Sequence, residues 1–424
     1  MHRPDNMHAS SPPRQNKAGG LYYGYWIVAS SFLVLMLVYG AQFSFGVFFK
    51  PMLKEFGLSR GVLSGAYSLN LAMQAVAYIF TGKLSDKYGP RVVVTFCGFS
   101  LGSSYLLMSQ VQMVWQIYVI FGVLTSIGTA CALVPLLSTI ARWFAFSRGL
   151  MSGIAAAGVG VGTLLLPPLC SYSIAAFGWR TSYIIIGLAV LILIVLSARL
   201  LKRDPSQPAP SVRGVPAPQH AHAAGDCTFQ GALRTRQFWL LGGVFFLLGA
   251  DVHSIFVHIV PHATDVGIPE VTAASIISVI GGVSIVSKVA VGIAVDRFGN
   301  KPVTVAIGSL MFLSLVMLQF SNALGVFYAF AVVFAFGYGG FVSMQSPYVA
   351  ELFGLRYHGA IFGFALFIQG AGAFGPFVTG RIFDAASSYR PAFAMLAVLS
   401  LLAVLLTVGI KKPIAGRQDG GGNG

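Results

Sequence analysis

Long apolar runs alternate with short polar connections along most of the chain. A helix needs about 20 apolar residues, each rising about 1.5 Å, to cross a hydrocarbon layer about 30 Å thick. Runs of this length lie near residues 24–49, 62–82, 92–110, 114–141, 148–172 and 179–201, and again near 237–261, 271–294, 303–321, 324–350, 358–380 and 391–410. The pattern therefore predicts an all-α membrane protein with twelve transmembrane helices in two groups of six.

The polar segments divide the chain into five parts. We expect an N-terminal tail, a six-helix bundle, a linker, a second six-helix bundle and a C-terminal tail over residues 1–21, 22–201, 202–236, 237–410 and 411–424. The linker holds several prolines and scattered cations, which predicts a flexible connection. The first tail lacks the apolar core of a signal peptide, so we expect the first span to be retained.

Two ten-residue stretches with one shared pattern lie 210 residues apart. Gly82–Arg91 reads GKLSDKYGPR and Gly292–Lys301 reads GIAVDRFGNK, each with an aspartate among cations and between glycines. The same offset relates Gly149 to Gly359. Two six-helix halves related by a repeat are typical of secondary transporters, which hold substrate at the interface between halves. The repeat therefore predicts two pseudo-symmetric bundles.

Composition indicates that lipid surrounds most of the chain. The mean hydropathy is +0.78, and only 9% of the residues are charged. The net charge of +15 is large enough to suggest nucleic-acid binding. However, most of the 27 Lys and Arg residues lie on alternate connections between the apolar runs and on both tails. By the positive-inside rule, this distribution places both termini, the linker and both repeated stretches in the cytoplasm, beneath the cell membrane. Membrane topology therefore explains the positive charge, and the sequence does not indicate nucleic-acid binding.

The sequence contains no enzyme or ATPase constellation. Glycines at 158, 160 and 162 lie inside an apolar run with no preceding strand, so they form no dinucleotide loop, and there is no Walker lysine motif. The four cysteines have neither metal-binding nor disulfide spacing. We therefore expect a non-enzymatic protein that uses no ATP, metal or cofactor.

The two repeated stretches resemble the signature loops of the major facilitator superfamily, between helices 2 and 3 and between helices 8 and 9. Within that superfamily, the chain is similar to the group of monocarboxylate transporters and oxalate–formate antiporters. This similarity is carried by Tyr23–Trp26, Arg142–Gly158 and His258–Gly267, and it extends over about residues 22–410. The resemblance implies a carrier of small carboxylate anions that works by alternating access.

Four positions depart from the pattern of that group. Phe43 stands where animal monocarboxylate transporters have a lysine, and Ser284 stands where they have an acid. Lys288 replaces the usual arginine of helix 8, and Ala365 replaces a second lysine of the oxalate carrier. A single intramembrane cation favours a substrate with one carboxylate over a substrate with two.

Lys288 is the strongest functional signal among the individual residues. It lies eight residues before Asp296, which is about 12 Å along a helix. An ionisable side chain at this depth is costly unless it faces water or a partner. We expect Lys288 to bind the substrate carboxylate. Snorkelling to the surface and a permanent pair with an acid are the alternatives.

Helix 7 carries two candidates for proton coupling, Asp251 and His253. A carboxyl group near mid-membrane can take up and release a proton as access alternates, and it could also pair with Lys288. Asp251 and His253 lie about 200° apart around the helix, so both cannot face a central cavity. His258 and His262 are weaker candidates, and local polar packing is the alternative for all four side chains.

Other side chains could complete a substrate site. Tyr118 and Tyr338 fall near positions where the resembled carriers place substrate-contacting tyrosines. Ser284, one turn from the helix 8 lysine, could add a hydrogen bond, and Phe43 and Phe367 could line a cavity. Ordinary packing is the alternative, because tyrosine and phenylalanine are common in membrane helices.

The loop aspartates are expected to form a conformational switch. The resemblance implies that they clamp the two halves together in one state and release them in the other. We expect Asp86 to cluster with Arg91 and Arg148. We expect Asp296 to cluster with Lys301 and with the corner formed by Arg356 and His358. A solvated charged turn is the alternative, although the pattern occurs twice.

These features together predict proton-coupled symport of lactate- or pyruvate-like monocarboxylates. The expected partners are a small carboxylate anion, H⁺ and the lipid bilayer. Exchange of organic anions, as in the oxalate–formate relatives, and a sensor that binds without transporting are the alternatives. The sequence leaves the oligomeric state open, with a monomer as one option.

Overall fold

A computed structural model of the chain describes residues 22–57, 60–204, 227–320 and 323–411, so both tails and the centre of the expected linker lie outside it. Within these residues all regular structure is helical, which confirms the predicted all-α fold. The helices are α1 (Tyr23–Phe43), α2 (Phe45–Phe56), α3 (Arg60–Tyr88), α4 (Pro90–Met108), α5 (Val114–Ile117), α6 (Ser126–Trp143), α7 (Arg148–Ala198), α8 (Phe229–Leu233), α9 (Arg236–Asp265), α10 (Glu270–Phe298), α11 (Asn300–Met317), α12 (Leu324–Phe353), α13 (His358–Ala371), α14 (Gly375–Ala386) and α15 (Arg390–Gly409).

Eleven helical stretches within the described residues are long and apolar enough to cross a membrane. They are Tyr23–Phe48, Pro90–Met108, Val114–Trp143, Arg148–Cys170, Tyr172–Ala198, Arg236–Asp265, Ser275–Phe298, Asn300–Phe320, Leu324–Phe353, His358–Phe383 and Arg390–Gly409. The remaining expected span corresponds to α3, which is 29 residues long and contains the buried polar residues Asn70 and Gln74. The arrangement agrees with the predicted twelve-helix fold.

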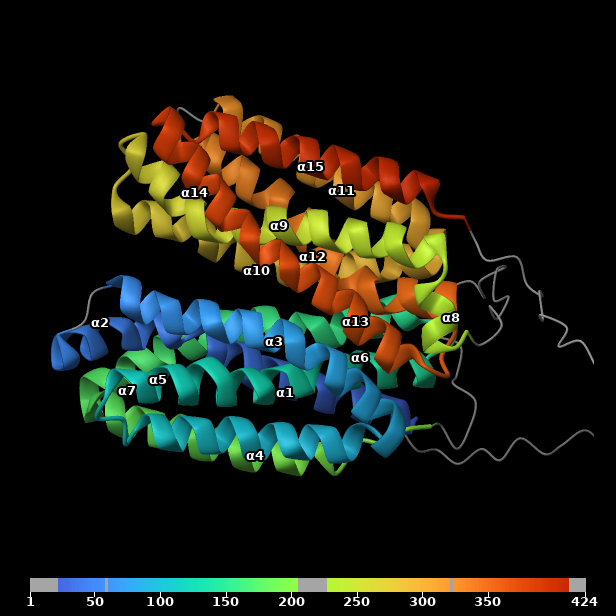
Figure 1. The fold of residues 1–424 in the computed structure, drawn as a ribbon, viewed down its shortest axis with the longest axis horizontal. Coiled ribbons are helices and arrows are strands. Elements are labelled where there is room, and N and C mark those ends of the chain that lie inside the picture. The colour runs from blue at the N-terminus through green and yellow to red at the C-terminus, as the bar shows by residue number, and fades with distance from the viewer. Residues whose placement is uncertain (1–21, 58–59, 205–226, 321–322, 412–424) are drawn as a thin grey trace, which may run out of the picture.

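The helices form two groups that lie side by side along their length. Figure 1 shows α1–α7 in the lower group and α9–α15 in the upper group, with the helices of both groups running along the long axis of the molecule. The two halves meet mainly where α3 packs against α13 and where α7 packs against α10. This is the arrangement expected from the 210-residue repeat.

Glycines allow the helices to approach one another closely. A Cβ atom at Gly158 or Gly162 on α7 would overlap the carbonyl oxygens of Phe32 and Met36 on α1. In a membrane, where lipid tails are as apolar as side chains, such close backbone packing provides much of the attraction between helices. Gly158 and Gly162 therefore form part of the contact surface between α7 and α1.

α7 contains two of the expected spans, joined at Gly178. This glycine has φ 78° and ψ 161°, a conformation that side-chain-bearing residues rarely adopt. The backbone turns there, between the expected spans near residues 148–172 and 179–201. The prediction of two spans in this region is confirmed.

A polar cluster braces the end of the first half that is distant from the repeated stretches. Arg180 lies 2.6 Å from Glu55 and donates to the carbonyl oxygens of Ser109 and Val111 at 2.8 Å. The indole of Trp179 also donates to Glu55, at 2.6 Å. Hydrogen bonds from Arg180 and then Trp179 hold the pKa of Glu55 below its ordinary value. The cluster ties α2, the α4–α5 connection and the corner of α7 together.

Candidate functional site

Lys288 lies in the middle of α10 with no exposed surface. Its Nζ donates to the Ser284 Oγ at 3.0 Å and lies 5.0 Å from the ring centre of Tyr338 on α12. Among the described residues, no carboxylate lies within 4.0 Å of this ammonium group. A buried cation surrounded by neutral groups attracts an anion strongly.

The backbone of Lys288 lies at the interface between the halves. A Cβ atom at Gly153 on α7 would overlap the Lys288 carbonyl oxygen, and the same oxygen accepts a hydrogen bond from Ser343 on α12 at 2.9 Å. The side chain is directed toward Ser284, one turn farther from the Asp296 end of α10. Neither snorkelling nor a permanent acid partner, the two alternatives, is observed among the described residues.

Asp251 lies on α9 and is also fully buried. Its Oδ2 accepts a hydrogen bond from Ser400 on α15 at 2.6 Å, while Oδ1 has no partner among the described residues. Asp251 therefore faces α15 inside the second half. The structure does not form the considered pair between Asp251 and Lys288.

His253 differs from Asp251 in its exposure and its bonding. It is half-buried, and its Nδ1 lies 2.6 Å from the carbonyl oxygen of Gly249, so Nδ1 carries the donated proton. This leaves Nε2 as the acceptor nitrogen of the ring. His258 instead uses both ring nitrogens, toward Tyr389 at 3.2 Å and the Pro376 carbonyl oxygen at 2.9 Å.

The remaining candidates have other neighbours. The structure brings Ser284 and Tyr338 to Lys288. Tyr118 begins a π-helical turn, Tyr118–Thr125, and its hydroxyl packs against Gly65. Phe43 is 40% exposed near the end of α1, and the Phe367 ring lies 5.7 Å from that of Phe364.

Each loop aspartate binds the first turn of a helix in the opposite half. Asp86 accepts hydrogen bonds from the backbone N–H groups of Gly359 and Ala360 in α13, at 3.2 and 2.8 Å. Asp296 accepts from Gly149 and Leu150 in α7, both at 2.7 Å. The two sets are related by the 210-residue offset. A carboxylate is favoured at a helix N-terminus, where free N–H groups and the helix dipole attract negative charge.

The partners of these aspartates correct the predicted ion-pair clusters. Asp86 pairs with Arg142 at 2.8 Å, whereas Arg91 is exposed and forms no ion pair in the described part of the chain. Lys301 donates to two carbonyl oxygens near the end of α15, both at 2.8 Å. Arg148 lies near Asp296 but donates to the Ala141 carbonyl oxygen at 3.1 Å. The observed clusters differ from the predicted ones because backbone N–H groups donate hydrogen bonds to both carboxylates. Such backbone donors cannot be recognised from the sequence.

His358, which was expected to cluster with Asp296, has other partners. It is buried between the halves, with Nδ1 2.9 Å from the Ser138 hydroxyl of α6 and Nε2 3.0 Å from the Ser346 carbonyl oxygen of α12. Two partners of buried aspartates were not predicted from sequence: Arg142, which pairs with Asp86, and Ser400, which donates to Asp251.

The fold and the site define a class of membrane protein. Two related helix bundles meet through glycine contacts and bury a cation at their interface. At one end, an aspartate of each bundle accepts hydrogen bonds from the first turn of a helix in the other bundle. These are features of a carrier built from two halves. The family model of the Major Facilitator Superfamily matches residues 31–374 and 263–422. The chain belongs to this superfamily of transporters and is a multi-pass membrane transporter rather than an enzyme.

Individual relatives are similar over nearly the whole chain. The oxalate:formate antiporter of Oxalobacter formigenes is 25% identical over 403 residues, covering 93% of each protein. Monocarboxylate transporter 12-B of Danio rerio is 24% identical over 431 residues, covering 94% of this chain and 90% of the relative. The predicted relationship to this group is confirmed.

Solved structures of other carriers share the fold. The human organic anion transporter MFSD10 (TETRAN) superimposes with a TM-score of 0.74 at 15% identity, covering 91% of this chain and 99% of that protein. The fucose:proton symporter of E. coli superimposes with a TM-score of 0.70 at 13% identity, covering 93% and 100%. At these identities the likeness concerns the fold alone.

Proposed function

We propose that the protein is a secondary active carrier of small monocarboxylate anions, such as lactate and pyruvate. The observation that carries the proposal is the fully buried Lys288, which lies at the interface between the halves with neutral neighbours. Burying an unpaired charge is expensive, and an anion that pairs with it removes much of this cost. The names of the monocarboxylate and oxalate:formate relatives support the same substrate class.

The charge at the site favours a substrate with one carboxylate. Lys288 supplies one positive charge as a compact ammonium group, which binds a carboxylate without the two-pronged geometry of arginine. Ser284 and the ring of Tyr338 complete its surroundings. A second carboxylate on the substrate would have to be buried without its own cation.

Proton coupling is the preferred mechanism, with Asp251 and His253 as the candidate groups. Asp251 is buried, and its Oδ1 has no hydrogen-bond partner in the described part of the chain, so a proton on the carboxylate would remove an uncompensated charge. The half-buried ring of His253 has its Nδ1 bonded to the Gly249 carbonyl oxygen, and no hydrogen bond to its Nε2 is formed by the residues that the structure describes. We further propose that the end bearing Asp86 and Asp296 faces the cytoplasm, as do both termini, and that the carrier resides in the cell membrane.

Uptake into proteoliposomes tests this function. With an acidic exterior and no anion loaded inside, labelled lactate is expected to accumulate, because an inward proton gradient drives symport. Uptake only after an internal anion is loaded would instead identify an exchanger. Binding without any uptake would identify a sensor. Liposomes without protein provide the baseline for passive diffusion of the protonated acid.

Asp296→Asn is expected to weaken the contact between the two halves at the end of the protein that bears the loop aspartates. The amide keeps the size of the side chain, but it loses the negative charge and one acceptor for the N–H groups of Gly149 and Leu150. The loss amounts to about 1–2 kcal/mol, or roughly tenfold in the equilibrium between closed and open arrangements. A cysteine placed at Ser138, beside His358, should then react about tenfold faster with a thiol reagent.

Arg91→Gln is the matched control for this prediction. Arg91 is an exposed cation that follows the first loop aspartate, and it forms no ion pair within the described residues. Its replacement should leave the cysteine reactivity unchanged. Equal reactivity in the Asp296→Asn and Arg91→Gln proteins would show that the carboxylate does not hold the halves together.

A further inference from the structure

Three buried oxygen atoms of α9 and α14 have no hydrogen-bond partner among the described residues. They are the Oδ1 atom of Asp251 and the Oγ atom of Ser254 on α9, and the Oγ1 atom of Thr379 on α14. All three side chains are fully buried. A buried polar atom is normally hydrogen-bonded, and where protein groups provide no partner an ordered water molecule does so. The three atoms therefore indicate a polar region between the two helices.

α14 lies alongside α9 where these atoms occur. A Cβ atom at Gly375 would lie 2.8 Å from the Oγ atom of Ser254. The Nε2 atom of His258 lies 2.9 Å from the carbonyl oxygen of Pro376, and a Cβ atom at Gly380 would lie 3.7 Å from the Cε1 atom of the same ring. As α14 continues from Gly375 to Gly380, its contacts on α9 thus move from Ser254 to His258.

The three atoms form a row along this contact, which we call the polar path. Ser254 follows Asp251 by three residues, so the two side chains are neighbours on α9, with Cβ atoms about 5–6 Å apart. Thr379 follows Gly375 by four residues and therefore shares the face of α14 that meets Ser254. The polar path runs from Asp251 through Ser254 to Thr379, which lies between two residues that contact His258.

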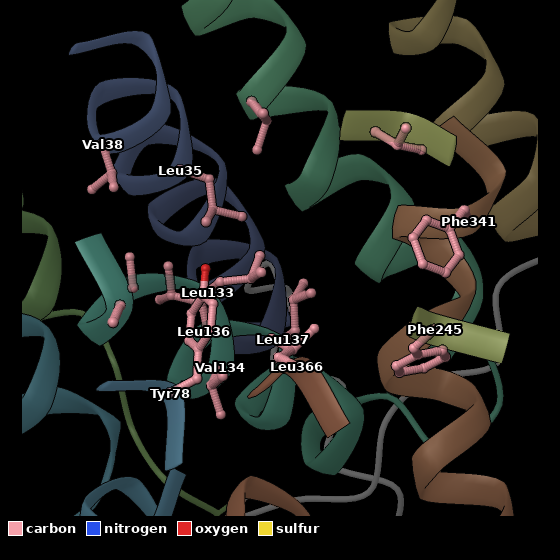
Figure 2. Packing of buried hydrophobic residues seen from close by; sticks show 14 of the residues in the cluster. Leu35, Val38, Tyr78, Leu133, Val134, Leu136, Leu137, Phe245, Phe341 and Leu366 are labelled. Carbon is pink, nitrogen blue, oxygen red and sulfur yellow. The ribbon is translucent and has the colours of Figure 1, made fainter. Parts of the chain in front are cut away.

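The surroundings of Asp251 differ on its two sides along α9. Toward the end that bears the loop aspartates, the ring of Phe245 packs edge-on against that of Phe341 on α12, at 5.8 Å between ring centres, and both are buried (Figure 2). These rings offer a proton no donor or acceptor. On the other side the polar path ends near His258, which is half-buried and so lies within reach of water. The path therefore leads from Asp251 toward the end opposite the loop aspartates.

No cation holds Asp251 in its charged form. Among the described residues, no Lys, Arg or His side chain lies within 4.0 Å of its carboxylate, and its one hydrogen bond comes from Ser400 of α15, at 2.6 Å to Oδ2. At the far end, His258 has both ring nitrogens engaged, toward Tyr389 and Pro376. The carboxylate oxygen that lacks a partner, Oδ1, is thus the atom available to receive a proton.

We propose that Asp251 takes up its proton from the end of the protein opposite the loop aspartates, through Thr379 and then Ser254. The inference rests on the proposed function, in which transport is coupled to protons, and it identifies Asp251 as the coupling group. Each hydroxyl oxygen receives one proton and passes its own proton on, with ordered water between the side chains. Ser254 and Thr379 therefore end unchanged, and the carboxylate of Asp251 becomes a neutral carboxylic acid.

The test compares two modes of transport in proteoliposomes that contain the purified full-length protein. Net uptake of labelled lactate under an inward proton gradient requires Asp251 to gain and lose a proton in every cycle. Exchange of labelled for unlabelled lactate, at equal pH and equal concentration on both sides, does not. Ser254→Ala and Thr379→Val should each lower the initial rate of net uptake roughly tenfold and the exchange rate by less than about twofold. Asp251→Asn should abolish net uptake and retain exchange.

Two further variants separate proton transfer from structure. Thr379→Ser keeps the hydroxyl group and should retain net uptake. Ser31→Ala is the matched control, because the Ser31 hydroxyl is buried in α1 and also has no partner within the described residues, so both rates should be unchanged.

Two results would overturn the polar path. One is net uptake at the wild-type rate in the Ser254→Ala, Thr379→Val or Asp251→Asn protein. The other is an equal fall in net uptake and exchange in the two hydroxyl variants, which would indicate a structural role. Absence of proton-driven net uptake by the wild-type protein would instead refute the proposed function itself.

Discussion

Lys288→Gln is expected to abolish measurable transport of monocarboxylates. Glutamine retains most of the length and the polarity of the side chain but removes a buried charge that has no ion-pair partner among the described residues. Removing one partner of a buried charge pair costs about 3–5 kcal/mol, so affinity should fall by roughly 100-fold or more. The measurements are binding of lactate to the purified protein and its initial rate of uptake into proteoliposomes.

Two further variants separate charge from fold. Lys288→Arg retains the cation and should preserve binding to a substantial extent. Lys301→Gln removes a lysine of α11 whose ammonium group donates to carbonyl oxygens near the end of α15, so substrate affinity should stay within about twofold of the wild-type value. Wild-type affinity in the Lys288→Gln protein would show that the substrate carboxylate binds elsewhere.

Gly292→Leu is expected to stop the transport cycle by a different route. A Cβ atom at Gly292 would overlap the carbonyl oxygen of Gly149, and a Cβ atom at Gly149 would overlap that of Gly292. A leucine side chain cannot enter this contact, so α7 and α10 would be held apart. Overpacking of this kind costs about 1–3 kcal/mol or more, and uptake should fall by roughly 100-fold.

Gly281→Leu provides a control on the same helix. A Cβ atom at Gly281 would have no neighbour within 4 Å, so a side chain there does not begin in contact with α7. Its uptake rate should remain close to that of the wild-type protein. The reaction rate of a cysteine at position 138 with a thiol reagent should increase in the Gly292→Leu protein. It should be unchanged in the Gly281→Leu protein. Normal uptake by Gly292→Leu would show that the halves need not touch at this point.

The helical architecture could be predicted because a membrane places strict demands on sequence. Backbone groups must be satisfied within each span, so spans appear as apolar runs of fixed length. The 210-residue repeat then defined two bundles. Lys288 was recognisable because an ionisable residue inside an apolar run is rare. These inferences depend on positions along the chain and not on how side chains are oriented.

Orientation around the helices limited what could be predicted about the site. Asp251 was considered as a partner of Lys288, yet it faces Ser400 on α15. Helical periodicity gives the angle between two residues on one helix but not the direction in which either faces its neighbours. The 210-residue repeat also makes Tyr78 the counterpart of Lys288, which places Tyr78 at the equivalent position of the first half. Tyrosine alone gave no signal, since it is common in membrane helices.

The backbone-to-backbone contacts between α3 and α13 and between α7 and α10 have an energetic consequence. Because glycine backbone forms part of these surfaces, their separation exposes less apolar side-chain area than the separation of surfaces formed by leucine side chains would. The two conformations can therefore lie close in free energy. A metabolite of only a few atoms, limited to about 1.5 kcal/mol of affinity per heavy atom, is then sufficient to choose between them.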